Sequence, residues 1–309
     1  MNKLGQQLKY QFKVGGMYIK LLYINTIIFI AFGVITTVFK LMLFDLSLIN
    51  SFKDAFSLYS EPAQLIRHPW GIFTYMFMHH DFWHLFGNML ILFFLGQLFE
   101  QHLGPKRLLS TYIIGGLFGA LIHLFSTYAF PFLRLDGYSI TLGASASVMA
   151  IFSAIGFYAP NKEIRLFGAI KVKLIVLTGI YLLLDFLRLS SHDNVAHFAH
   201  LGGAFWGFLF VYNLKKGKDI STWFDKFANS VKQIFSFRNK IKIVHTKKKK
   251  TKFNTYKPDN PPKDDYTYNL NKKKRQEKVD QILDKIKDSG YDSLSKADKD
   301  FLFDASKNI

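Results

Sequence analysis

The sequence predicts an all-α membrane protein: a polytopic bundle of six transmembrane helices followed by a cytoplasmic tail. Half of the 309 residues are hydrophobic, the chain contains 33 Phe, and long apolar runs recur from Tyr18 to Leu214. A membrane-spanning helix needs about 20 mainly apolar residues. Six stretches meet this requirement, and they lie near 21–44, 76–99, 108–130, 142–159, 170–189 and 195–214.

Lysine and arginine in the short connections predict how these spans are oriented, because cytoplasmic loops are enriched in both. One set of connections, which includes both ends of the six-span segment, holds Lys3, Lys9, Lys13, Lys106, Arg107, Lys162, Arg165, Lys171, Lys173, Lys215, Lys216 and Lys218. The opposite set holds only Lys53, Arg67, Arg134 and Arg188. We therefore expect a multi-pass integral membrane protein with cytoplasmic N- and C-termini.

The composition limits the kinds of site and partner. There are no cysteines, which excludes disulfides, thiolate metal sites and cysteine nucleophiles. The net charge is +18, but much of it follows Leu214, so we expect no nucleic-acid partner. A polar arm precedes a first apolar run that is too long for a signal peptide, so we expect no cleaved signal.

We expect four parts along the chain: a cytoplasmic N-terminal arm (1–17), a membrane domain (18–214), a basic linker or juxtamembrane segment (215–275) and a small helical cytoplasmic tail (276–309). Within the linker, residues 223–237 could form an amphipathic helix. Basic blocks at 247–250 and 272–275 would be attracted to anionic lipids at the cytoplasmic surface.

The tail reads as two short helices. Val279, Ile282, Leu283 and Ile286 are spaced for one helical face, and Gly290 would end the first helix. A docking unit and a solvated tail both remain open. The loop 45–73 is also unusual, because it is long and rich in aromatic residues, and we expect it to lie in the outer membrane interface.

Polar side chains inside spans are costly and are therefore candidate site residues. The second, fourth and sixth spans carry them, with His79, His80, His84, Asn88, Ser145, Ser147, His197 and His200. These spans all run inward from the outer face. At 1.5 Å per residue, Ser145, His200 and His84 lie at a similar depth, roughly 6–12 Å below that face.

Small residues predict that the fourth and sixth spans pack closely. His200, Gly203 and Gly207 share one helical face, and Ala146 and Ala150 lie on a small-residue stripe beside Ser145. His200 could therefore reach Ser145 and activate its hydroxyl, which is a poor nucleophile without a base. Taken alone, Ser145 would be an ordinary helix-packing residue.

His84 and Asn88 are four residues apart, so their side chains lie side by side and could stabilise an anionic oxygen. Asn88 could equally be a hydrogen-bonding contact between helices. No acidic residue is expected beside His200, because Asp185 is placed deep in the fifth span and Asp193 in the following loop. We therefore expect a Ser–His dyad rather than a triad.

Several motifs together resemble the rhomboid intramembrane serine proteases. They are His79-His-Asp-Phe-Trp-His84-Leu-Phe-Gly-Asn88-Met, Gly96 to Glu100, Gly143-Ala-Ser145, and Ala199-His200-Leu-Gly-Gly203 with Gly207. The resemblance covers about 18–214 and matches the basic six-span form, which we expect here to be a bacterial protein of the inner membrane. Ala146 stands where many members of the family have Gly.

The resemblance implies a serine-type endopeptidase that cleaves transmembrane or membrane-adjacent protein segments without a metal or cofactor. It implies Ser145 as nucleophile, His200 as general base, and His84 and Asn88 as oxyanion-hole side chains. Five further residues receive supporting roles: His79 near the site, Glu100 at the inner end of the second span, and Gly143, Gly203 and Gly207 in packing. If the register of the sixth span differs, the base would be His197.

Three alternatives compete with this interpretation. An inactive relative would bind transmembrane helices as a scaffold or chaperone. A histidine-box metalloenzyme would use His79, His80, His84, His197 and His200 as ligands, although no His-Glu-x-x-His motif is present. A transporter would need an inverted repeat, and none is recognisable.

Overall fold

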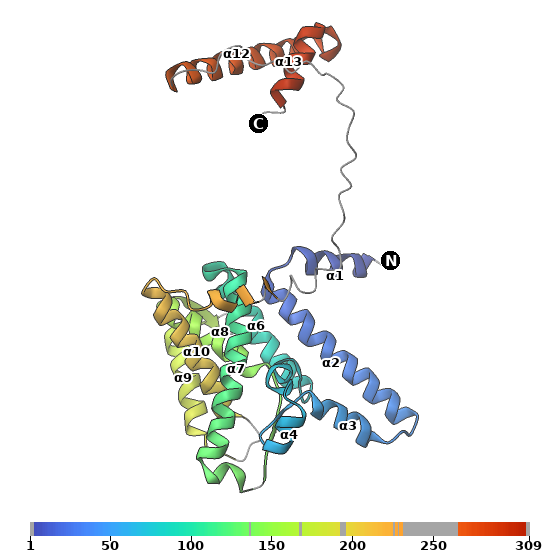
Figure 1. Ribbon diagram of the computed structural model, residues 1–309, viewed down its shortest axis with the longest axis vertical. Helices are drawn as coiled ribbons and strands as arrows, with labels where there is room; N and C mark the ends of the chain where they lie inside the picture. Colours follow the sequence, from blue (N-terminus) through green and yellow to red (C-terminus); the bar gives the residue numbers. More distant parts are fainter. Residues whose placement is uncertain are drawn as a thin grey trace. The chain divides into compact units, whose positions relative to one another are not determined.

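The computed structural model describes residues 3–135, 137–166, 169–191, 196–224, 226–227, 229–230 and 265–306 (Figure 1). The chain divides into two compact units, Met1–Lys240 and Ile241–Ile309. Each unit is described separately below.

The first unit is mainly helical. Its long helices are α1 (Lys3–Val14), α2 (Met17–Leu41), α6 (Phe82–Leu103), α7 (Pro105–Ala129), α8 (Ser145–Tyr158), α9 (Leu174–Leu187) and α10 (His197–Lys215). In the part of the chain that the structure describes, three helices are long and apolar enough to cross a membrane, namely α2, α6 and α7. Helices α8 and α9 are apolar but shorter, with 14 residues each.

Local sequence signals explain where α6 begins and ends. The predicted second span starts at 76, but residues Tyr75–Phe77 form a 3-10 helix (η1) and α6 starts only at Phe82. Asp81 caps α6, because its carboxylate accepts the backbone N–H of His84 at 2.9 Å. Gly104, with φ of 86°, ends α6, and Pro105 opens α7.

A β-hairpin precedes α9 and was not predicted from the sequence. Strands β3 (Glu163–Leu166) and β4 (Ile170–Lys173) pair in antiparallel register, with Ile164 opposite Val172. The predicted fifth span included 170–173, but charged and apolar residues alternate there, which suits a strand rather than a buried helix. The helix therefore begins at Leu174.

The predicted interfacial loop consists of short elements. They are α3 (Leu46–Ala55), β1 (Leu58–Tyr59), α4 (Pro62–Arg67) and α5 (Gly71–Thr74). Strand β1 pairs with β2 (Ile140–Thr141), and a further 3-10 helix, η2 (Pro131–Arg134), follows α7. The loop is thereby hydrogen-bonded to the segment that leads into α8.

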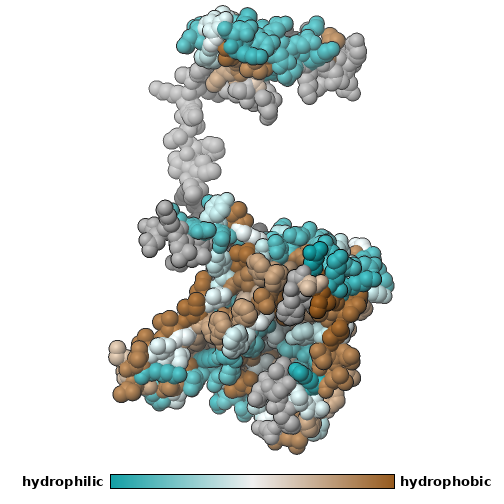
Figure 2. All heavy atoms as spheres, turned by 180° about the vertical axis from the view of Figure 1, so that it is seen from behind, coloured by the Kyte–Doolittle hydropathy of each residue, from teal (hydrophilic) through white to brown (hydrophobic). Residues whose placement is uncertain are grey.

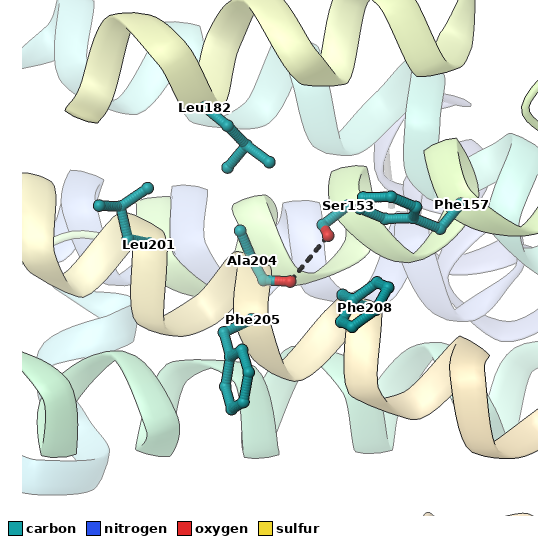
Figure 3. A pocket seen from close by; sticks show the side chains of 7 residues that line it. All are labelled: Ser153, Phe157, Leu182, Leu201, Ala204, Phe205 and Phe208. Carbon is teal, nitrogen blue, oxygen red and sulfur yellow. Dashed lines mark hydrogen bonds between the residues drawn. The ribbon is translucent and has the colours of Figure 1, made fainter. Parts of the chain in front are cut away.

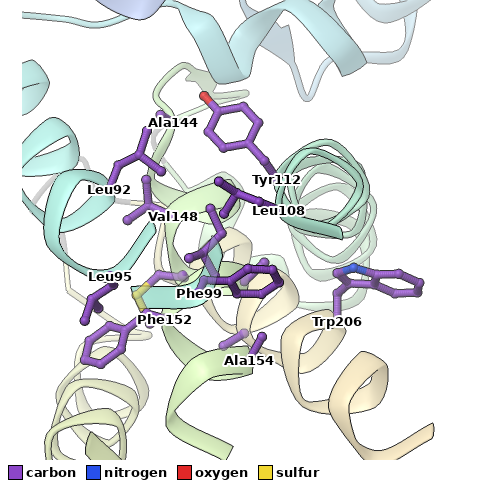
Figure 4. Packing of buried hydrophobic residues seen from close by; sticks show 14 of the residues in the cluster. Leu92, Leu95, Phe99, Leu108, Tyr112, Ala144, Val148, Phe152, Ala154 and Trp206 are labelled. Carbon is purple, nitrogen blue, oxygen red and sulfur yellow. The ribbon is translucent and has the colours of Figure 1, made fainter. Parts of the chain in front are cut away.

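Helices α7, α8 and α10 form the centre of the unit, and α10 packs extensively on both others. Figure 4 shows the apolar core around α8, which includes Val148, Phe152 and Ala154 of this helix and Phe99 and Trp206 of neighbouring helices. The contact of α8 with α10 is unusually close. A methyl group added at Gly203 would overlap the backbone carbonyl of Ala146, and one at Gly207 would overlap that of Ala150.

Glu100 joins α6 to α2 near the C-terminal end of α6. One oxygen of its carboxylate, Oε2, accepts the backbone N–H of Tyr18 at 3.1 Å, in the first turn of α2. A Cβ atom at Gly16 would lie 2.5 Å from the other oxygen, Oε1. The carboxylate thus occupies the space beside the N-terminus of α2, where a negative charge is favoured.

The outer surface of this unit is strongly apolar. Figure 2 shows broad hydrophobic areas on it, and α2 alone exposes Ile27, Ile30, Val34 and Val38. Contiguous exposed apolar surface of this kind is typical of a membrane-facing or partner-facing region. Together with the three long apolar helices, it indicates an integral membrane protein.

The second unit contains α12 (Asp265–Ser289), a 3-10 helix η4 (Tyr291–Ser293) and α13 (Lys296–Ser306). Gly290, with φ of 78°, lies directly after α12. Ile282 and Leu294 are buried, and Lys285 pairs with Asp298 at 3.5 Å. Helix α12 starts earlier than the expected tail at 276. Most of the expected helix 223–237 and the basic block 247–250 lie outside the described residues.

The close contact between α8 and α10 predicts that Gly203→Ala and Gly207→Ala destabilise the membrane domain. Each added methyl group would have to push one helix backbone away from the other, at a cost of roughly 1–3 kcal/mol. The matched control is Gly179→Ala in α9, where a Cβ meets nothing within 4 Å. Thermal unfolding in detergent should show lower midpoints for the first two variants only. Equal midpoints for all three would contradict the packing.

Candidate active site

The candidate site residues come together at one end of the helix bundle. Ser145 is the first residue of α8, His84 lies in the first turn of α6, and His200 lies in the first turn of α10. Helices α7 and α9 end where α8 and α10 begin, and they bring His123 and Asp185 to this end. Five helices therefore contribute to one polar cluster at this end of the bundle.

The backbone before Ser145 has a conformation that requires glycine. Gly143 has φ of 137°, and its N–H donates to the carbonyl of Tyr75 at 3.0 Å. A Cβ atom at this position would lie 2.7 Å from Nε2 of His84 and 3.6 Å from Oγ of Ser145. The His84 ring and the Ser145 hydroxyl therefore lie against the same peptide segment.

The neighbours of Ser145 and His200 meet at one point on α7. A Cβ atom at Gly119 would lie 2.5 Å from Cβ of Ala146 and 2.8 Å from the carbonyl oxygen of Ala199. Ser145 and His200 are each one residue from this junction. Their side chains make no direct hydrogen bond with each other among the described residues; in protease sites without substrate, this bond is often long and tightens on binding.

The expectation that no acidic residue lies beside His200 is wrong. Oδ1 of Asp185 lies 3.0 Å from Nδ1 of His200 and 2.5 Å from Nδ1 of His197. All three residues are at least nine-tenths buried. From the sequence, Asp185 was expected deep in the fifth span, but α9 ends at Leu187 and Asp185 lies in its last turn. Helix α9 therefore presents this carboxylate at the end where α10 begins.

These contacts determine what the imidazole of His200 can do. A neutral imidazole carries one N–H donor and one acceptor nitrogen. When Nδ1 donates to the Asp185 carboxylate, Nε2 is left as the acceptor, which is the form that a general base requires.

The other predicted side chains surround His84. The ring of His79 is buried and packs edge-to-face against that of His84, with centroids 5.3 Å apart. Asn88 is also buried, and its Nδ2 donates to the His84 carbonyl at 2.9 Å. An amide nitrogen has two N–H donors, so one donor remains for another acceptor. The hydrogen bond from the His84 N–H lowers the pKa of Asp81 below its usual range, which keeps this cap ionised.

His123 is a further polar residue that the sequence analysis did not assign to the site. Its Nε2 lies 3.2 Å from Oγ of Ser139 and 3.0 Å from Oγ1 of Thr141. Ser139 is in turn bonded to Ser60, next to β1. This network fixes the segment that leads to Gly143 and Ser145. The position of His123 near the outer end of the predicted third span was the feature of the sequence that could have indicated its place near the site.

Asp185, His197 and His200 also form the described cluster that could hold a metal ion, since one potential ligand atom from each lies within 4.8 Å of the others. Of the five ligands in the histidine-box alternative, His197 and His200 belong to this cluster, whereas His79, His80 and His84 do not. Direct hydrogen bonds between the imidazoles and the carboxylate account for its short distances.

An apolar groove of about 330 Å³ lies further along α8 and α10, away from the polar cluster. Figure 3 shows its lining residues Ser153, Phe157, Leu182, Leu201, Ala204, Phe205 and Phe208. The one hydroxyl in it, that of Ser153, donates to the Ala204 carbonyl at 2.7 Å. The groove therefore offers an apolar surface and no chemically reactive group.

Comparisons with known proteins identify the family of this region. Residues 67–217 match the rhomboid domain model, and residues 264–308 match a family of unknown function (DUF6576). The chain is 32% identical over 158 residues to RHOMBOID-like protein 12, mitochondrial, of Arabidopsis thaliana, which covers 48% of this chain and 47% of the relative.

Two further relatives are informative. Rhomboid protein 1, mitochondrial, of Saccharomyces cerevisiae is 30% identical over 145 residues, covering 45% of this chain and 40% of the relative. Inactive RHOMBOID-like protein 8 of Arabidopsis thaliana is 30% identical over 136 residues, covering 43% of this chain and 35% of the relative. The match thus spans half or less of each relative named here.

These relatives come from eukaryotes, and two are named mitochondrial, so the expected bacterial origin and bacterial inner membrane are not borne out. The resemblance to rhomboids itself is confirmed by the domain match and by the relatives. Residues 67–217 of this chain therefore form a rhomboid domain.

Proposed function

We propose that this protein is an intramembrane serine endopeptidase in which Ser145 is the nucleophile and His200 the general base. The observation that carries the proposal is the tethered imidazole of His200. Its Nδ1 is held by Asp185, and α10 packs against α8 directly beside Ser145. A base with a fixed tautomer next to a serine at a helix N-terminus is the arrangement that activates a hydroxyl.

The proposed reaction begins when Oγ of Ser145 attacks the carbonyl carbon of the scissile peptide bond and Nε2 of His200 takes the hydroxyl proton. The tetrahedral intermediate collapses as His200 passes that proton to the leaving amine, which gives an acyl-enzyme. A water molecule, deprotonated by His200, then attacks the ester and releases the new carboxyl end.

His84 and Asn88 are suited to stabilise the negative oxygen of the intermediate. The His84 ring lies against Gly143, next to Ser145, and Asn88 keeps one N–H donor for an acceptor. The backbone N–H of Ser145 is one of the unpaired donors at the start of α8. Donors of this kind stabilise charge that develops only in the transition state.

The length of α8 supports a substrate within the membrane. Its 14 residues span about 21 Å, which is shorter than the roughly 30 Å hydrocarbon core. If its C-terminal end lies at the inner interface, Ser145 lies below the outer one, level with the end of a transmembrane segment. We propose six spans, cytoplasmic termini and, for the basic segments after Leu214, attraction to anionic lipid.

A catalytically inactive scaffold that binds transmembrane helices is the second candidate, because one relative is named inactive. Ser145 and His200 are both present, and Asp185 is bonded to His200, which favours the protease. A metalloenzyme built on Asp185, His197 and His200 is the third. The three candidates differ in which substitutions remove activity.

Ser145→Ala and His200→Ala are each expected to lower cleavage of a model transmembrane substrate in liposomes by at least about 10³-fold, because each removes the attacking group or its base. The matched control is Ser147→Ala, a buried serine of the same helix whose hydroxyl contacts Sδ of Met76. Cleavage that survives in Ser145→Ala and is lost with a metal chelator would favour the metalloenzyme. Binding without cleavage by the wild type would favour the scaffold.

Gly143→Ala is expected to abolish cleavage, because its methyl group would displace the His84 ring. Gly137→Ala is the matched control: Gly137 also has a positive φ, of 95°, but a Cβ atom there meets nothing within 4 Å. Both variants place an alanine at a positive φ, which costs roughly 1–3 kcal/mol in backbone strain, so the control shows what such strain alone does to cleavage. An equal loss of cleavage in both would contradict a specific role for the contact with His84.

Loss of oxyanion stabilisation predicts that His84→Ala and Asn88→Ala each lower kcat by roughly 10²- to 10³-fold with little change in KM. Steady-state kinetics of the liposome-reconstituted protein would measure both constants. Unchanged kcat in either variant would remove that residue from the proposed oxyanion site.

A further inference from the structure

One carboxylate oxygen at the candidate site serves two imidazoles. Oδ1 of Asp185 lies within hydrogen-bond distance of Nδ1 of both His197 and His200, at 2.5 and 3.0 Å. The exposed fractions of the three residues are 5%, 5% and 7%. A buried ionised carboxylate is costly unless it is hydrogen-bonded or paired, so two donors on one oxygen form a strong and directed arrangement.

We propose that Asp185 is the positioning residue of His200, so that the site operates as a Ser145–His200–Asp185 triad, with His197 holding the same carboxylate in place. The proposal rests on the proposed function and adds a third functional group to it.

The geometry gives Asp185 two tasks. Its hydrogen bond keeps the proton of neutral His200 on Nδ1, so that Nε2 is the acceptor. Because the two nitrogens lie on different edges of the ring, a ring anchored to α9 through Nδ1 leaves Nε2 free for another partner. The negative charge also stabilises the imidazolium that forms when His200 takes the serine proton.

His197 lies one helical turn before His200 on α10. Its bond to the same oxygen restrains the carboxylate, because a rotation of Asp185 would break both contacts at once. His197 is therefore expected to act on the reaction through Asp185, and its removal should cost less than removal of the carboxylate.

The test compares Asp185→Asn, Asp185→Glu and His197→Ala in the full chain reconstituted in liposomes. Asp185→Asn is nearly isosteric but can offer an N–H where the imidazole needs an acceptor. It should lower kcat by roughly 10²- to 10⁴-fold and leave KM within about threefold. Asp185→Glu restores a carboxylate and should recover part of kcat, and His197→Ala should lower kcat by less than Asp185→Asn does.

Thr178→Val is the matched control on α9. Thr178 is fully buried and its hydroxyl bonds within the same helix to the Leu174 carbonyl at 2.8 Å, so this variant tests the effect of removing a buried polar group from α9. Its kcat should match that of the wild type. Substrate binding by Ser145→Ala with and without Asp185→Asn shows whether the fold survives, and equal affinities are expected.

Failure of the inference and failure of the proposed function give different results. If Ser145→Ala and His200→Ala are inactive while Asp185→Asn keeps kcat within about threefold, the protease stands as a dyad and the inference is wrong. If Asp185→Asn loses substrate binding together with thermal stability, the role is structural and the inference is also wrong. If the wild type neither cleaves nor reacts at Ser145 with a fluorophosphonate, the proposed function fails and the inference fails with it.

Discussion

The close contact of α8 with α10 is the constraint on which the rest of the site depends. Gly203 and Gly207 leave room for the backbone carbonyls of Ala146 and Ala150, so the two helices approach more closely than larger residues would allow. This approach fixes Ser145 and His200 on neighbouring helix ends. Gly119 of α7 lies against Ala146 of α8 and Ala199 of α10, so a third helix packs against both helices where they meet.

Several polar groups at this end support a neighbour. Asp185 binds two imidazoles, His123 binds the hydroxyls that precede α8, and Asn88 binds the carbonyl of His84. Buried polar groups left without partners would each cost a few kcal/mol. Such a network holds its members in fixed orientations, which a preorganised catalytic site requires. The cap of α6 also helps to position the site. Asp81 accepts the backbone N–H of His84 and so fixes the helical turn that carries the His84 side chain.

The lengths of the helices matter when they are compared with the thickness of a membrane. Helices α2, α6 and α7 are long enough to cross the hydrocarbon core, whereas α8 and α9 are shorter. A helix shorter than the hydrocarbon core can end inside it, so polar residues at its end could lie below the surface with longer neighbours between them and the lipid. Ser145 and Asp185 lie at such ends, at the start of α8 and in the last turn of α9.

Local features of the chain could be predicted from the sequence, because they depend on residues close together in it. The apolar stretches indicated a helical membrane protein, and Gly104-Pro105 lies at the predicted boundary between two spans. The candidate residues on α6, α8 and α10 were found because polar side chains are rare in apolar spans. The small-residue stripes indicated which faces could meet, and the motifs indicated the rhomboid family.

The tertiary structure decided the contacts between distant parts of the chain. Asp185 was placed at the wrong depth, because the end of α9 could not be located from the sequence, so its bond to His200 was missed even though both residues were named. The pairing of Leu58 with Thr141 and the hairpin before α9 depend on how the helices are arranged. The sequence by itself therefore determined which polar residues are candidates for the site, since burying a polar group is a local cost. The packing of five helices decided which of those residues act on one another, because a hydrogen bond requires an approach of about 3 Å that only the assembled bundle creates.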